Sequence, residues 1–120
     1  NIKNLIEILD MNIKNTNFAL ISTLPWNPEQ NREYRQEEFE SKQGIRSNEL
    51  IRKIYEEARK MLVNFGNVIY IDAFSEMLDN HNRLNREYSL DGIHLSEKAY
   101  EKFTKIIKPV ILDYYMKISG

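Results

Sequence analysis

The sequence is poor in the residues on which many reactive sites depend. Its 120 residues include no cysteine, two histidines, four glycines and three prolines. Without cysteine, disulfide frameworks, thiolate zinc sites and cysteine nucleophiles are excluded. The net charge of -1 gives no overall bias toward nucleic acid or an anionic membrane. No apolar run approaches the roughly 20 residues needed to span a bilayer. A length of 120 residues is typical of a single domain, so we expect one globular domain and no second one.

The first residues also lack the features of a leader sequence. The chain begins Asn1-Ile2-Lys3, without an initiator Met, a basic region or an apolar region. Nothing there resembles a signal peptide, and our expectation is therefore a cytoplasmic protein. Because the first residue is not Met, we also expect that the chain starts within a longer sequence or was processed.

Apolar residues recur at helical spacing in three segments of the chain. The first predicted helix covers 1–15, and the second begins at a cap formed by Ser47 or Asn48 and ends near Gly66. The third begins after Ser96 and should kink or break at Pro109, which cannot donate the next hydrogen bond.

Two short apolar runs between these helices are typical of buried strands. They cover 18–24 and 67–71, and a small helical turn is expected over 73–78. Strands that alternate with helices indicate an α/β fold with a parallel sheet. Two parallel strands alone leave too much open edge, so part of the sheet should lie outside this chain. The charged stretch 26–42 is read as a solvated loop or short helix, with a substrate-facing lid as the alternative.

The candidate chemistry lies just before the last helix, in the segment Leu90-Asp91-Gly92-Ile93-His94. A carboxylate beside an imidazole can accept its Nδ1 proton, which leaves Nε2 free to act as a base toward a hydroxyl or water. The loop follows the second predicted strand and should emerge at the carboxyl edge of the sheet, where open α/β folds bind ligands. A purely structural hydrogen bond between Asp91 and His94 is the competing interpretation. His81, in a polar loop, is expected to be solvated.

The segment around His94 resembles the last block of the SGNH (GDSL) hydrolase family, whose hallmark is Asp-x-x-His near the C-terminus. The matching residues run from Tyr88 to Ser96, followed by a helix that carries Tyr100. Upstream, the order of a strand ending in Leu24-Pro25-Trp26, a helix with Asn48 and a strand ending at Asp72 is similar too. The resemblance implies a flavodoxin-like three-layer α/β/α fold and a serine ester hydrolase. It implies His94 as the general base, Asp91 as its orienting carboxylate, and no metal or organic cofactor.

What the resemblance requires and the chain does not show is the nucleophile. The family places it in a Gly-Asp-Ser segment near the N-terminus of the domain, and its oxyanion donors lie in the earlier blocks. Seven serines are present, and none lies in a glycine-flanked turn between a strand and a helix. The resemblance therefore implies that residues 1–120 are the C-terminal portion of one SGNH-type domain, and we expect this chain alone to be inactive. Its partner should be the missing N-terminal portion or a second copy at the exposed sheet edge.

The substrate is constrained only weakly by the sequence. Trp26 follows the first predicted strand and is a candidate to line the acyl or alcohol pocket, although a core or rim position is equally compatible. The charge of the stretch 26–42 argues against an apolar lid of the kind that covers lipid substrates. It therefore favours short-acyl or carbohydrate esters over long lipids.

Two other functions compete with ester hydrolysis. One is a metal site formed by Asp91, His94, His81 and Asp79, although this spacing matches no standard zinc pattern. The other is a non-catalytic α/β module that binds a protein through its charged loop and helical faces.

Overall fold

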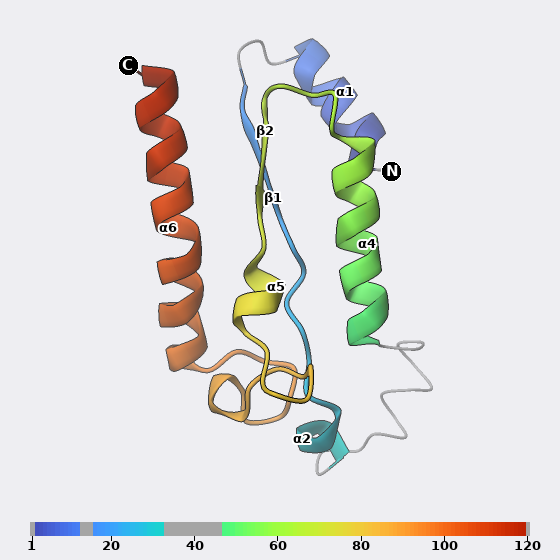
Figure 1. The fold of residues 1–120 in the computed structure, drawn as a ribbon, viewed down its shortest axis with the longest axis vertical. Coiled ribbons are helices and arrows are strands. Elements are labelled where there is room, and N and C mark those ends of the chain that lie inside the picture. The colour runs from blue at the N-terminus through green and yellow to red at the C-terminus, as the bar shows by residue number, and fades with distance from the viewer. Residues whose placement is uncertain (1, 13–15, 33–46, 120) are drawn as a thin grey trace.

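The computed structural model of the chain describes residues 2–12, 16–32 and 47–119. In chain order its elements are α1 (Ile2–Asn12), β1 (Phe18–Ile21), α2 (Pro28–Arg32), α4 (Asn48–Met61), β2 (Val68–Ile71), α5 (Ala73–Glu76), the 3-10 helix η1 (Arg86–Tyr88) and α6 (Glu97–Ser119). Figure 1 shows α2 and the segment leading to α6 at one end of the molecule, toward which both strands run, with α5 between β2 and that end. The polar loops therefore gather at the carboxyl ends of the strands.

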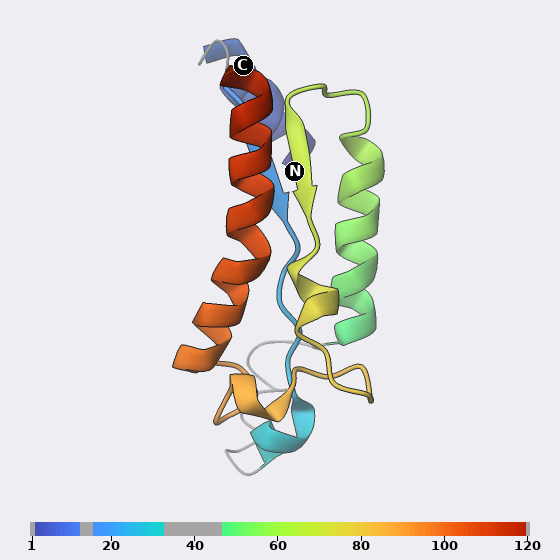
Figure 2. The same ribbon diagram turned by 60° about the vertical axis from the view of Figure 1, so that its left-hand side comes forward.

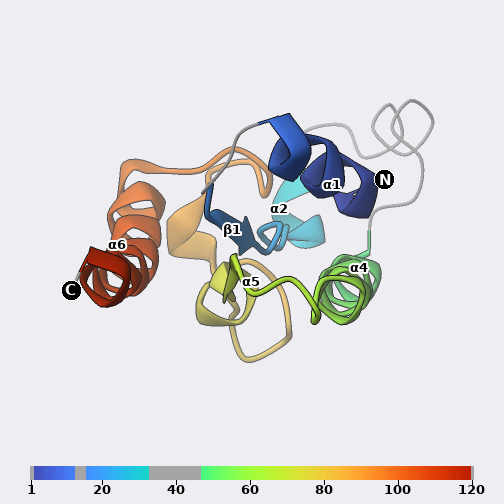
Figure 3. The same cartoon turned by 90° about the horizontal axis from the view of Figure 1, so that it is seen from above.

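The two strands form a parallel sheet, as the sequence predicts. Phe18 lies opposite Val68, and the register continues to Ile21 opposite Ile71. Figure 3 shows α6 on one side of this sheet and α1 with α4 on the other, and Figure 2 shows α6 and α4 flanking the strands along their length. The predicted α/β fold is confirmed.

Buried side chains form two clusters that fix these layers. One, between α1, α4 and the sheet, consists of Ile6, Leu62 and Val68. The other, beneath the segment that leads to α6, consists of Met77, Leu84 and Ala99. Leu84 and Ala99 are completely buried at the two ends of the segment that carries Asp91 and His94. That segment is therefore anchored in the core on both sides.

Several predicted boundaries differ from the structure. The first strand ends at Ile21 rather than at residue 24. The first helix is described as Ile2–Asn12, and its predicted end at 13–15 lies outside the described residues. Ser47 does cap α4, since its Oγ accepts from the Leu50 amide at 3.2 Å. The prediction that this helix ends near Gly66 is wrong. The helix stops at Met61, and Leu62 is its C-cap. The Leu62 amide bonds the Ala58 and Arg59 carbonyls, and the Leu62 side chain packs into the core.

The prediction of a break at Pro109 is also wrong, because α6 continues to Ser119. Pro109 removes one donor, and the carbonyl of Lys105 loses its partner in the helix. Both residues lie on the exposed side of α6. Water can therefore take the place of the lost donor, and the helix persists.

Asn48 joins the start of α4 to the segment after β1. Its Oδ1 accepts from the Trp26 amide at 2.9 Å, and its Nδ2 donates to the Trp26 carbonyl at 2.9 Å and the Asn82 carbonyl at 3.1 Å. The side chain thus bonds three main-chain groups far away in the sequence.

Replacing Asn48 by aspartate is expected to destabilise the protein by about 1–3 kcal/mol, because two carbonyls lose their donor and face a carboxylate instead. Chemical denaturation measures the effect. The neighbouring exposed substitution Glu49→Gln is the control and should change stability by less than about 0.5 kcal/mol. Equal effects of the two variants would contradict this role of Asn48.

Candidate functional site

The structure brings Asp91 and His94 into direct contact in the loop between η1 and α6. His94 Nδ1 lies 2.5 Å from Asp91 Oδ2. The His94 side chain is 85% exposed and that of Asp91 is 27% exposed. The imidazole therefore stands on the surface with Nε2 open to solvent, while the carboxylate is set back into the loop.

Main-chain amides hold the Asp91 carboxylate in this position. Its Oδ1 accepts from the amides of Ile93 at 2.9 Å and His94 at 2.8 Å. Gly92 allows the chain to turn back toward Asp91, since its φ of 84° lies in the left-handed region. The short Asp-x-x-His spacing is thus sufficient to build the pair locally.

The hydrogen bonds also keep Asp91 ionised. Partial burial acts to raise its pKa, but the bonds from the His94 ring and from the His94 and Ile93 amides outweigh burial. The pKa of Asp91 is therefore well below its usual range. An ionised carboxylate can only accept, so Nδ1 of His94 carries the proton and Nε2 presents a lone pair. This is the tautomer that a general base needs.

Five of the six serines in the described residues make structural hydrogen bonds, and the sixth, Ser119, is exposed at the end of α6. The Ser22 Oγ accepts from the Phe74 amide at 2.8 Å, and the Ser75 Oγ donates to Asp72 at 2.7 Å. Ser47 and Ser96 cap helices. The Ser89 Oγ lies 2.6 Å from the His94 carbonyl oxygen rather than from its ring. Within the part of the chain that the structure describes, no serine hydroxyl bonds the His94 imidazole.

Trp26, the candidate pocket residue, lies in the segment after β1 and is only 9% exposed. Its carbonyl also accepts from the Leu84 amide at 3.0 Å, which ties its main chain to the loop that precedes η1. Its role toward a substrate stays a prediction.

The residues of the rival metal site do not come together. His81 donates its amide to Asp79 Oδ1 at 2.7 Å, while Asp79 Oδ2 pairs with Arg83 at 3.3 Å. In residues 2–12, 16–32 and 47–119, no three His, Asp or Glu side chains are grouped so that they could hold a metal ion. Asp79 acts in the structure as an acceptor that closes its own loop.

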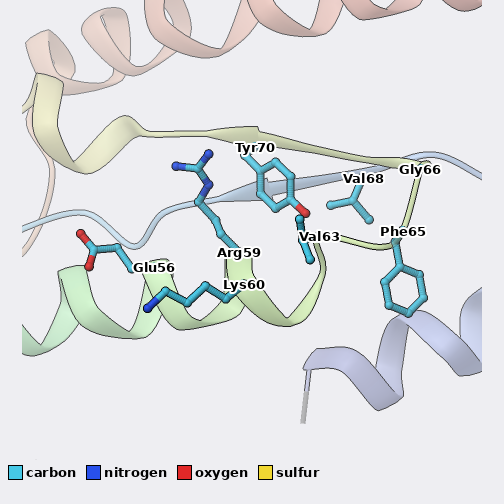
Figure 4. A pocket seen from close by; sticks show the side chains of 8 residues that line it. All are labelled: Glu56, Arg59, Lys60, Val63, Phe65, Gly66, Val68 and Tyr70. Carbon is cyan, nitrogen blue, oxygen red and sulfur yellow. The ribbon is translucent and has the colours of Figure 1, made fainter.

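A hollow of about 520 Å³ lies elsewhere, between α4 and β2. Figure 4 shows Arg59 and Lys60 of α4 on one side of it and Tyr70 of β2 on the other. The Arg59 guanidinium lies 5.2 Å from the centre of the Tyr70 ring. Neither Asp91 nor His94 lines this hollow, so it is separate from the Asp–His site.

Sequence reasoning did not find Asn27 and Gln30, two buried residues after β1. Asn27 donates its amide to the Gly92 carbonyl at 2.9 Å, and Gln30 Nε2 donates to the Ser89 carbonyl at 2.7 Å. They lie in the stretch interpreted as a solvated loop, a short helix or a lid. α2 shows that the short helix is present at 28–32, whereas 33–42 lies outside the described residues.

The fold and the site together describe an α/β chain that displays an exposed Asp–His pair at the carboxyl edge of a parallel sheet. Comparison with solved structures finds one from Streptococcus pneumonia described as a "putative platelet activating factor". It is 27% identical to this chain, with a TM-score of 0.75 over 91% of the chain. The match spans 48% of that structure, so this chain corresponds to about half of it.

No family model and no curated protein matches the chain. Among the described residues, none of the helices is both long enough and apolar enough to cross a membrane.

Proposed function

We propose that this chain supplies the general base and its orienting carboxylate to a serine ester hydrolase of the SGNH type. One observation carries the proposal: the His94–Asp91 contact fixes the tautomer that leaves Nε2 free. In the reaction, Nε2 takes the proton of a serine hydroxyl as the hydroxyl attacks the ester carbonyl. The protonated ring, stabilised by Asp91, then returns that proton to the leaving alcohol.

The nucleophile and the oxyanion donors come from polypeptide other than the described segments. None of the described serine hydroxyls bonds the His94 ring, and the Nε2 side of His94 is open. The solved neighbour supports this division, because a further half of its chain lies outside the match. Its description points only weakly to a hydrolase. Short-acyl or carbohydrate esters remain the proposed substrates, with Trp26 as a pocket residue.

The proposed partner is the N-terminal portion of the domain or a second copy. In the described part of the chain, β1 pairs with β2 alone and leaves its other edge open. The last turns of α6 also expose large apolar side chains, namely Ile111, Leu112, Tyr115, Met116 and Ile118. Such a surface is typical of a face that another polypeptide covers.

Hydrolysis of p-nitrophenyl acetate tests the proposal. The 120-residue chain alone is expected to give no rate above that of its His94→Ala variant, because nucleophile and oxyanion donors are both lacking. Expression with the segment that precedes it in the reading frame should give a rate that depends on His94. A His94-dependent rate from the chain alone would contradict the proposed division, and inactivity of the extended protein toward short-acyl and carbohydrate esters would contradict the proposed chemistry.

A further inference from the structure

We propose that Gln30 is a positioning residue for the His94–Asp91 pair, acting through the main chain of the turn that precedes it. Gln30 lies in α2 and is only 6% exposed. Its Nε2 donates to the Ser89 carbonyl at 2.7 Å and to the Arg86 carbonyl at 3.2 Å. One amide group therefore holds both ends of the turn from which the Asp91 loop departs.

Ser89 passes this constraint on to the pair. Ser89 is buried, and its Oγ accepts from the Gly92 amide at 2.8 Å. The same oxygen lies 2.6 Å from the His94 carbonyl oxygen and 3.2 Å from Asp91 Oδ1. Fixing the main chain of Ser89 therefore fixes a hydroxyl that touches the loop on both sides of Gly92.

Asn27 sets the orientation of α2 against the same loop. Its Oδ1 accepts from the Glu29 amide at 3.0 Å, at the start of α2. Its own amide donates to the Gly92 carbonyl at 2.9 Å, and its Nδ2 donates to the Leu84 carbonyl at 2.9 Å. The segment that carries Gln30 is thus aligned with the loop by bonds independent of Gln30.

Packing alone does not account for a glutamine at this position. Its Oε1 is buried and has no hydrogen-bond partner among the described residues, which carries a desolvation penalty. An apolar side chain of similar length would fill the space without that penalty. What it would lack is the pair of donors to Arg86 and Ser89.

The consequence concerns the tautomer of His94. Asp91 fixes the proton on Nδ1 only while the loop holds the carboxylate against that nitrogen. If the turn at Ser89 loosens, the ring is released to the mixture of tautomers that a solvated imidazole adopts. His81 provides the reference, because it is exposed and its hydrogen bond to Asp79 is donated by its main-chain amide, not by its ring.

The test is ¹⁵N NMR of the two imidazole rings at alkaline pH, in the wild type and in Gln30→Met and Gln30→Glu. Methionine removes the donors, and ionised glutamate turns acceptors toward two carbonyls. The Nδ1–H form should predominate for His94 in the wild type, and both variants should shift the ring toward the mixture seen for His81. Glu49→Gln, an exposed substitution in α4 whose carboxylate pairs with Lys53 of the same helix, should leave His94 unchanged.

A cooperative thermal unfolding transition shows that a variant is folded. If only one of the two Gln30 variants folds, that variant alone is sufficient for the NMR test. The wild-type tautomer retained in the folded variants would overturn the proposal, as would an equal shift in Glu49→Gln. The effect of Gln30 on catalysis rests on the proposed function. In the extended protein, the Gln30 variants should lower kcat without changing KM. Because the NMR measurement needs no substrate, an inactive protein would count against the hydrolase and not against the positioning role.

Discussion

In the protein extended to include the nucleophile, His94→Ala is expected to lower kcat/KM for p-nitrophenyl acetate by about four to six orders of magnitude. The loss is this large because the described residues offer no second imidazole at this site. The imidazole stands on the surface with Nε2 free, and the other histidine, His81, lies in a different loop. The rate that remains would come from binding and the oxyanion donors.

The substitution should leave the fold intact, since the His94 side chain is 85% exposed. His81→Ala is the matched control, because it removes the other imidazole from a loop at the same end of the molecule and should leave kcat/KM within about twofold. A His94→Ala enzyme that keeps its activity within about tenfold of the wild type would contradict a role as general base.

Sequence alone was sufficient for the features that depend on neighbouring residues. The apolar spacing gave the three long helices and both strands, since each pattern reflects a face that must be buried. The Asp91–His94 contact was also within reach, because it needs only three residues and a glycine that turns the chain between them. Ser47 as a cap is local in the same way.

The missed features depend on contacts between distant segments. Gln30 and Asn27 bond carbonyls 56 to 59 residues away, and nothing in a polar stretch distinguishes such a clamp from a solvated loop. α4 ends at Met61, before Gly66, and the next residue, Leu62, packs in the core with α1 and β2. Pro109 is tolerated because its face of α6 is exposed. In these two cases tertiary packing or solvent exposure overrode a local signal.

Asp91→Asn is the second substitution with a large expected effect, a fall in kcat of about 10⁴-fold with little change in KM. Asparagine can still accept from the Ile93 and His94 amides through Oδ1, so the loop should keep its shape. Its Nδ2, however, would face His94 Nδ1 as a donor. The ring would then have to accept on Nδ1 and carry its proton on Nε2, which is the wrong tautomer for a base.

Asp79→Asn separates this effect from a general cost of removing a loop carboxylate. Asp79 also accepts main-chain amides, from His81 and Arg83, and lies in the loop before η1. Both variants lose bonds to a carboxylate, so both should be somewhat less stable to denaturant. Only Asp91→Asn should combine the loss of kcat with a change of the His94 tautomer in ¹⁵N NMR. Equal kinetic losses in the two variants would mean that Asp91 only supports the loop, and the hydrolase would then need a different partner for His94.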